Sequence, residues 1–157
     1  MNRGFERAAA MKSDFLLTMN DDCRLPEDYV ENLVNGYESV GGGDRIMGSM
    51  SFSVEEPKSV IFSGVKKIVW WRYKVYYYVP KNTVAKEDYT GCYPSYSLPG
   101  RGILIPMSIY SKIGGFDEQF IQYYSDSEYI FRSIKKGYEA FVCWDAKVLT
   151  YLSKTGK

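Results

Sequence analysis

The sequence contains no histidine and only three cysteines among its 157 residues. The absence of histidine excludes Ser-His-Asp and Cys-His catalysis, and it excludes zinc sites that use histidine ligands. Cys23, Cys92 and Cys143 lie far apart in the sequence and form no Cys-x-x-Cys pair, so neither a zinc ribbon nor a redox motif is expected. The chemistry that is left belongs to carboxylates, hydroxyls, basic side chains and backbone donors, which would suit a hard, oxygen-binding cation.

Long apolar runs and a strong net charge are also missing. No run approaches the ~20 apolar residues that span a bilayer, and residues 1–15 contain no signal-peptide pattern. The net charge of +1 gives no indication of a nucleic-acid partner. A small, odd number of cysteines fits a reducing compartment. We therefore expect a cytoplasmic protein, compatible with work at the inner face of the membrane, with no transmembrane segment and no nucleic-acid partner.

The residues that are present indicate one globular domain. Apolar residues make up 45% of the chain and charged residues 25%, which is enough to bury a core. Aromatic residues reach 17%, including 15 tyrosines. Such a surplus suits binding grooves for sugars or bases, and it equally suits the packing of strands.

Hydrophobic patterns predict an α/β domain, because strands and helices alternate early in the chain. The expected helices cover residues 6–12, about 26–39, 108–113 and 126–136. The expected strands cover residues 15–19, 45–53, 59–62, 102–105, 140–144 and 148–152. Residues 65–79 alternate as one strand would, with a helix as the second interpretation, and residues 80–99 read as a long loop.

Polar residues end the first predicted strand in the stretch FLLTMNDDCRLPEDYVENLV. Asn20, Asp21 and Asp22 stand at its C-terminal end, where open α/β sheets place their ligands. Adjacent carboxylates repel each other unless a cation or hydrogen bonds compensate. Two interpretations stay open at this point. One aspartate caps the following helix, or the pair serves a divalent cation that bridges to a diphosphate.

Two further stretches carry candidate functional residues. In the second, Asp117 and Glu118 follow a glycine turn, and Asp126 and Glu128 stand at a helix start with Arg132 one turn later. Capping and a Glu-Arg pair explain this pattern, and so does a carboxylate that accepts a proton from a sugar hydroxyl.

The third stretch is LPGRGILIP. Gly100 and Gly102 flank Arg101, which would let the backbone approach a ligand while the guanidinium offers a forked donor. A strained turn that leads into a strand is the alternative.

In order and spacing, the segments MNRGFERAAAMKSDFLLTMNDDCRLPEDYVENL and LPGRGILIPMSIYSKIGGFDEQFIQYYSDSEYIFRSIKKGYEAFV resemble the family-two glycosyltransferases, which are inverting enzymes of the GT-A fold. The likeness is to bacterial rhamnosyl- and galactofuranosyl-transferase-like members, which implies polysaccharide biosynthesis for the cell envelope. It also implies a Rossmann-like GT-A domain that uses Mn²⁺ or Mg²⁺. Such a domain transfers a sugar from a nucleotide-diphosphate donor, a UDP- or dTDP-sugar, to a glycan or lipid-linked acceptor.

The resemblance assigns roles to individual residues. Asn20 and Asp22 occupy the two ends of the family's Asp-x-Asp motif with Asp21 between them, and Asp22 would bind the metal or the sugar-diphosphate. Asp126 matches the catalytic base that deprotonates the acceptor hydroxyl. Gly100, Arg101 and Gly102 match the family's loop beside the donor sugar and the acceptor, and they are expected to bind the donor. The residues expected to bind the acceptor are Asp117, Glu118, Tyr124 and Glu128.

The sequence departs from the family pattern in three ways. Asn20 stands where many members have an aspartate, and the late metal-binding histidine expected near Thr150 or Tyr151 is absent. The resemblance also begins inside the family's domain, so we expect residues 1–157 to form a single partial domain without the first nucleotide-binding βαβ portion.

A second hypothesis is a non-catalytic carbohydrate- or protein-binding remnant of such a domain. Its groove would use Trp70, Trp71 and the tyrosines of 73–78. Divalent-dependent nucleotide binding distinguishes the two hypotheses, because only the enzyme requires it.

Overall fold

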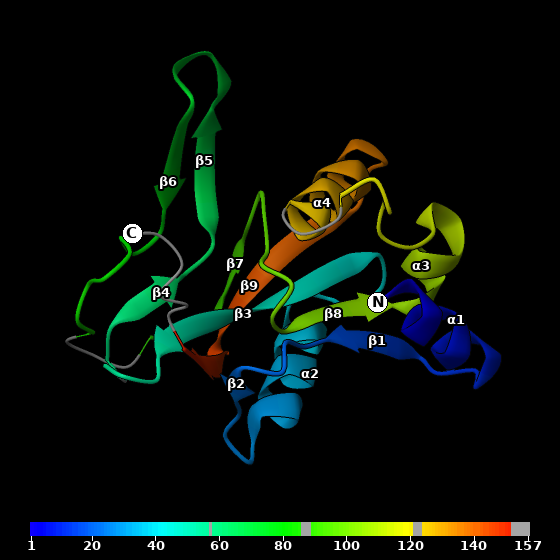
Figure 1. Ribbon diagram of the computed structural model, residues 1–157, viewed down its shortest axis with the longest axis horizontal. Coiled ribbons are helices and arrows are strands. Elements are labelled where there is room, and N and C mark those ends of the chain that lie inside the picture. The colour runs from blue at the N-terminus through cyan, green and yellow to red at the C-terminus, as the bar shows by residue number, and fades with distance from the viewer. Residues whose placement is uncertain (57, 86–88, 121–123, 152–157) are drawn as a thin grey trace.

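A seven-stranded mixed sheet runs through the centre of the molecule (Figure 1). The structure is a computed structural model that describes residues 1–56, 58–85, 89–120 and 124–151. The main strand order is β1-β8-β3-β9-β2, with β4 beside β3 and β7 beside β9. The strands are β1 (Phe15–Thr18), β2 (Cys23–Arg24), β3 (Arg45–Ser53), β4 (Val60–Phe62), β7 (Cys92–Pro94), β8 (Ile103–Pro106) and β9 (Glu139–Thr150).

The strand directions bring three C-terminal ends to one edge of the sheet. β3 and β9 are parallel, and their register runs to the pair Ser53 and Thr150. β8 is antiparallel to both β3 and β1, so β1 runs in the same direction as β3 and β9. The segments that follow Thr18, Ser53 and Thr150 therefore leave the sheet on the same side. This is the edge at which α/β sheets bind their ligands.

Helices cover both faces of the sheet because its strands alternate their side chains between two cores. In β8, Ile103 and Ile105 face a core that includes residues of α1, α3 and α4, whereas Leu104 faces the core beneath α2. β9 alternates in the same way, with Val142 in the first core and Cys143 in the second. The helices are α1 (Asn2–Ala10), α2 (Tyr29–Ser39), α3 (Met107–Ile113) and α4 (Ser125–Lys135).

Two sequence expectations about the sheet need correction. The predicted strands 140–144 and 148–152 are parts of one strand, β9, which ends at Thr150, and residue 152 lies outside the described residues. Within β9 the pairing with β3 skips from Cys143 to Lys147. Such a bulge breaks the alternation that a sequence pattern relies on. The predicted loop 80–99 contains β7, whose Cys92 pairs with Cys143 of β9.

Residues 65–79 do not form one continuous strand. They fold into β5 (Val65–Val69), a single turn of 3₁₀ helix labelled η1 (Trp70–Arg72), and β6 (Lys74–Tyr77), which pairs back on β5. Tyr73 adopts a left-handed conformation with φ of 50°, and the chain reverses there. The result is a separate two-stranded sheet that projects from the body of the molecule (Figure 1).

Candidate active site

Asn20, Asp21 and Asp22 form an exposed turn between β1 and β2. The helix that follows begins only at Tyr29, and Asp28 occupies its N-cap position, so neither Asp21 nor Asp22 caps it. The capping interpretation of the paired aspartates is therefore wrong. Asp22 accepts a weak hydrogen bond from the Cys23 thiol at 3.7 Å, which leaves most of the lone pairs of its carboxylate open to solvent.

The loop Gly100–Gly102 lies directly against the end of β1. The amide of Gly102 donates to the carbonyl of Thr18 at 2.8 Å, and the hydroxyl of Ser49 donates to the carbonyl of Gly102 at 3.1 Å. Gly102 has φ of +86°, and a Cβ atom there would overlap the hydroxyls of Tyr29 and Ser49. A strained turn into a strand is thus present, and glycine is required for it.

Arg101 points along the same edge of the sheet. Its Nη1 donates to the Thr150 hydroxyl at 3.0 Å, and Thr150 is the register partner of Cys23. Burial raises the pKa of the Cys23 thiol, with the charge of Asp22 as a second cause, while the charge of Arg101 acts against both. The charges of Arg101 and Asp22 therefore act on the same thiol in opposite directions.

Asp126 ties the first turn of α4 to this loop. Its Oδ2 accepts a hydrogen bond from the amide of Gly100 at 2.8 Å, and its Oδ1 accepts one from the amide of Ser127 at 2.8 Å. The residue at the N-cap of α4 is Tyr124, and it makes no side-chain capping bond. Because a carboxylate has about four acceptor positions, Asp126 still has capacity for a further donor such as a hydroxyl.

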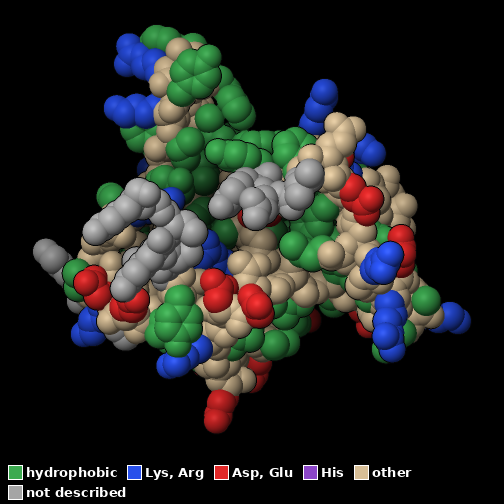
Figure 2. Space-filling model, viewed as in Figure 1, with side chains coloured by type: hydrophobic (Ala, Val, Ile, Leu, Met, Phe, Trp, Pro, Cys, Tyr) green, Lys and Arg blue, Asp and Glu red, His purple; other side chains and the backbone are tan. Residues whose placement is uncertain are grey.

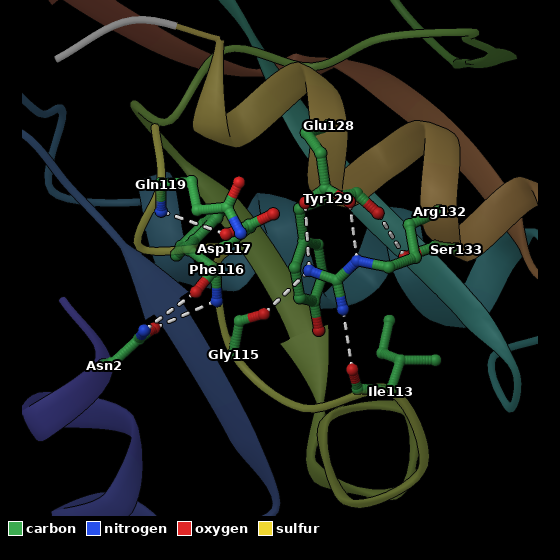
Figure 3. Close-up of polar contacts among 10 residues, drawn as sticks. All are labelled: Asn2, Ile113, Gly115, Phe116, Asp117, Gln119, Glu128, Tyr129, Arg132 and Ser133. Carbon is green, nitrogen blue, oxygen red and sulfur yellow. Dashed lines mark hydrogen bonds and ion pairs between the residues drawn. The ribbon is translucent and has the colours of Figure 1, made fainter. Parts of the chain in front are cut away.

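Glu128, in the same first turn of α4, forms an ion pair with Arg132. Arg132 donates from Nε and Nη2 to its two carboxylate oxygens at 2.7 and 3.0 Å (Figure 3). The guanidinium also donates to the carbonyls of Ile113 and Gly115 at 2.6 and 2.8 Å. The Glu-Arg pair expected from the sequence is present, and it fixes the glycine turn after α3 to α4.

The other predicted acceptor residues lie around this turn. Asp117 accepts a hydrogen bond from the amide of Gln119 at 2.9 Å, and Glu118 accepts one from the Asn2 side chain at 3.0 Å. The side chain of Tyr124 makes no hydrogen bond to another described residue, and Tyr124 is 74% exposed. It lines an open hollow of about 500 Å³ together with Phe120, Ser127, Glu128, Phe131, Arg132 and Lys135.

The described residues form no all-protein metal site. No group of three or more Cys, Asp or Glu side chains in that part of the chain is arranged to hold a cation. Asp22 offers one exposed carboxylate. This fits Mg²⁺ or Mn²⁺ only if a ligand supplies the remaining oxygen atoms, and Mg²⁺ bound to substrate phosphates commonly has that arrangement.

Sequence reasoning did not identify the residues that hold the loop Gly100–Gly102 in place. Thr18 and Thr150 both end strands at this edge, and both accept hydrogen bonds from the loop. Tyr29 supports the loop indirectly, because its hydroxyl is hydrogen-bonded at 2.7 Å to Ser49, which in turn donates to the Gly102 carbonyl. A polar residue near the end of a predicted strand is the sequence signal that marks Thr18 and Thr150.

Comparisons with known proteins bear on the fold. Neither family models nor curated protein sequences gave a match. Solved structures do match, among them a crystal structure of GalNAc-T7 with UDP, GalNAc and Mn²⁺, with a TM-score of 0.64 and 11% sequence identity. The chain has a GT-A-like fold. The alignment covers 94% of this chain and 30% of the chain of that structure, so the likeness supports the architecture of a nucleotide-sugar transferase at the level of the fold.

No helix in the described part of the chain combines the length and the apolar character needed to cross a bilayer.

Proposed function

We propose that this chain is part of a glycosyltransferase that moves a sugar from a nucleotide-diphosphate donor to the hydroxyl of a glycan or lipid-linked acceptor, with inversion. The observation that carries the proposal is the 2.8 Å hydrogen bond from the Gly100 amide to Asp126. It joins the helix that resembles the acceptor side of family-two enzymes to the loop that resembles their donor side. A reaction between two substrates needs such a junction, because the acceptor oxygen and the donor sugar must meet at one carbon atom.

On the donor side, Asn20, Asp21, Asp22, Gly100, Arg101 and Gly102 would bind the sugar diphosphate. Arg101 is held at the sheet edge by Thr150, where its charge can offset that of a diphosphate. Asp22 would be the protein ligand of a divalent cation, which supplies stabilisation for the negative charge of the leaving diphosphate when it is bound. The UDP and Mn²⁺ in the GalNAc-T7 structure make a uridine nucleotide with Mn²⁺ the first combination to test.

On the acceptor side, Asp126 would accept the proton of the attacking hydroxyl. The acceptor oxygen forms a bond to the anomeric carbon from the face opposite the diphosphate, the bond to the diphosphate breaks, and the proton moves to a carboxylate oxygen of Asp126. Tyr124 and the free edges of Asp117, Glu118 and Glu128 would contact the acceptor. The partial hydrogen bonding of Asp126 holds it in place for this role.

A transfer assay tests the proposal. The chain, or the longer protein that contains it, is mixed with UDP- and dTDP-sugars, Mn²⁺ and oligosaccharide or lipid-linked acceptors, and the release of nucleoside diphosphate is measured. We expect acceptor-dependent release that Asp126→Asn slows by a factor of roughly 10²–10⁴ and that Asp44→Asn preserves, since the side chain of Asp44 makes an exposed ion pair with Lys112 at 3.9 Å. Nucleotide binding without any dependence on a divalent cation would instead favour the non-catalytic binding remnant.

A further inference from the structure

The hairpin of β5, η1 and β6 exposes an unusual set of aromatic side chains. Trp70 is 67% exposed, Trp71 74% and Tyr73 97%, and all three lie at the tip. Val75 and Tyr76 extend this surface along β6, with exposures of 43% and 44%. Isolated pairs of strands with an apolar surface are rarely left bare in water, so these side chains point to a partner.

The hairpin is held firmly at its base. The amide of Val65 donates a hydrogen bond to the Ser95 hydroxyl at 2.8 Å. The Ser63 hydroxyl bridges to both the amide and the carbonyl of Val79 at 2.8 Å. Ile68 and Tyr77 pack against the main core. The direction in which the tip projects is therefore set by the body of the molecule.

The charge on the hairpin has one sign. Between Val65 and Tyr78 the sequence has the cations Lys66, Lys67, Arg72 and Lys74 and no acidic residue. Figure 2 shows the same projection as hydrophobic and basic side chains together. The ion pairs found among the described residues lie elsewhere, at Arg45–Glu139, Lys112–Asp44 and Arg132–Glu128.

The cations lie on or beside the aromatic rings. The guanidinium of Arg72 stacks over Trp71 at 4.2 Å from the ring centroid, and the ammonium groups of Lys66 and Lys74 lie within 6 Å of Tyr78 and Tyr76 respectively. Amphipathic aromatic rings and adjacent cations are the combination found where proteins meet the headgroup region of a bilayer. The surface therefore has both an apolar component and a component complementary to negative charge.

We propose that the hairpin tip docks the chain on a membrane surface that contains anionic lipids. Trp70, Trp71 and Tyr73 would enter the headgroup region, while Lys67, Arg72 and Lys74 would meet the lipid phosphates. Each cation close to an anionic leaflet strengthens binding about fivefold, and this attraction falls within a Debye length as salt increases. A hairpin with several cations and three aromatic side chains combines two membrane-binding signals, one apolar and one electrostatic.

The docking surface continues towards the candidate acceptor site. Trp70 contacts Phe131 of α4 with 5.5 Å between ring centroids, and Phe131 lines the hollow that also contains Tyr124. A membrane beneath the tip would bring this hollow close to the lipid headgroups. The conclusion that the acceptor is lipid-linked and not a soluble glycan follows from the docking and rests on the proposed function.

Vesicle binding by the full chain tests the docking. Co-sedimentation and tryptophan emission are measured with phosphatidylcholine vesicles and with vesicles that also contain 30% phosphatidylglycerol (a composition of our choice, roughly matching an anionic leaflet). We expect binding and a blue-shifted emission with the anionic vesicles only, weakening as salt increases. Lys67→Gln/Lys74→Gln should lower the partition coefficient about 25-fold, and Trp71→Ser/Tyr73→Ser about tenfold or more.

Matched variants on another surface serve as controls. Arg7→Gln/Lys136→Gln removes two exposed cations outside the hairpin, and Met11→Ser removes an apolar side chain that is 71% exposed. Both controls should bind vesicles as the unmodified chain does. If the aromatic variant fails to fold by circular dichroism, the lysine variant still decides the question, because it keeps every aromatic and apolar side chain of the hairpin.

Three results would overturn the docking. The first is no binding to anionic vesicles at low salt, and the second is equal loss in the hairpin variants and the controls. The third is that the chain does not bind vesicles, and the hairpin variants instead abolish self-association or binding to a soluble oligosaccharide. Because vesicle binding needs no donor, a chain that binds vesicles without transferring sugar contradicts the proposed function alone. A chain that transfers sugar but does not bind anionic vesicles contradicts the docking alone.

Discussion

Asp126 and Glu128 stand two residues apart in the first turn of α4, yet they serve different regions of the molecule. Glu128 belongs to a framework region, where Arg132 binds both of its oxygens and two backbone carbonyls (Figure 3). Asp126 belongs to the site region, where its contacts are single amide donors from Gly100 and Ser127. The difference teaches that carboxylates at one helix start can be separated by what the protein pairs them with, which is a charged guanidinium for Glu128 and neutral backbone amides for Asp126.

The largest expected effect is the loss of turnover in Asp126→Asn. Asparagine preserves the size of the side chain but cannot accept the proton of the acceptor, so kcat should fall by a factor of roughly 10²–10⁴. Its single carbonyl oxygen can keep only one of the two amide bonds, which should cost about 1 kcal/mol of stability. Steady-state kinetics and urea unfolding separate the two effects. Near-normal kcat in this variant would remove Asp126 as the base.

Asp22→Asn should act on the donor. It keeps an oxygen ligand but removes the charge that faces the cation and diphosphate, and we expect Mn²⁺-dependent donor affinity to fall about 10²-fold, a loss within the several kcal/mol that a metal ion contributes. Calorimetry with and without Mn²⁺ measures this. Asp21→Asn, at the neighbouring position, is the matched control and should weaken binding less. Equal effects at both positions would contradict the assignment of Asp22 as metal ligand.

Arg132→Met should test the framework region. Methionine retains much of the side-chain volume but leaves Glu128 and the carbonyls of Ile113 and Gly115 without their donor. Because the side chains of Arg132 and Glu128 are 26% and 23% exposed, water can compensate in part, and we expect a loss of about 2 kcal/mol in the free energy of unfolding. Arg45→Met, which breaks the more exposed pair with Glu139, should lose less than about 1 kcal/mol. Equal losses would remove the distinction between the pairs.

The smallest expected effect concerns Tyr29, which supports the loop of the site region. Burial raises its pKa to about 12 from the ordinary value of 10. Because the pKa in the folded state lies above that in the unfolded state, this contribution to stability is fully present below pH 10. It is lost as the pH rises from 10 through 12.

Tyr29→Phe should therefore reduce stability by about 1 kcal/mol at neutral pH, through the lost bond to Ser49. It should also make the free energy of unfolding fall less steeply above pH 10. Urea unfolding at several pH values measures both effects. Tyr73→Phe, at a position that is 97% exposed, is the control and should show neither. An unchanged alkaline slope in Tyr29→Phe would show that the buried hydroxyl is not responsible.

The sequence allowed much of the sheet to be predicted because β3 and β8 keep the pattern of buried strands. β3 was predicted at the boundaries seen in the structure, Arg45–Ser53, and β1 and β8 within one residue at each end. The hairpin could not be predicted, since its reversal depends on Tyr73 in a left-handed conformation that tyrosine rarely adopts. β9 was divided in two because its bulge interrupts the alternation.

The candidate site was predictable only in part. Asn20, Asp21 and Asp22 are recognisable because an amide followed by two adjacent carboxylates is unusual at the end of an apolar strand, and family resemblance led to Asp126. That the Gly100 amide contacts Asp126, 26 residues away, depends on how α4 packs on the sheet. No local pattern carries that information. The sequence also left open whether Asp21 or Asp22 caps the following helix. The start of α2 at Tyr29, three residues after Pro26, shows that neither does.

The most direct test of the central claim is calorimetry of UDP and dTDP binding in the presence of Mn²⁺, with this chain preceded by the nucleotide-binding portion that the family resemblance implies. The account predicts that at least one nucleotide binds, that removal of Mn²⁺ with a chelator weakens the binding, and that Asp22→Asn weakens it to a similar extent while Asp126→Asn leaves it nearly unchanged. Failure of both nucleotides to bind, or binding that neither the chelator nor Asp22→Asn alters, would contradict the account.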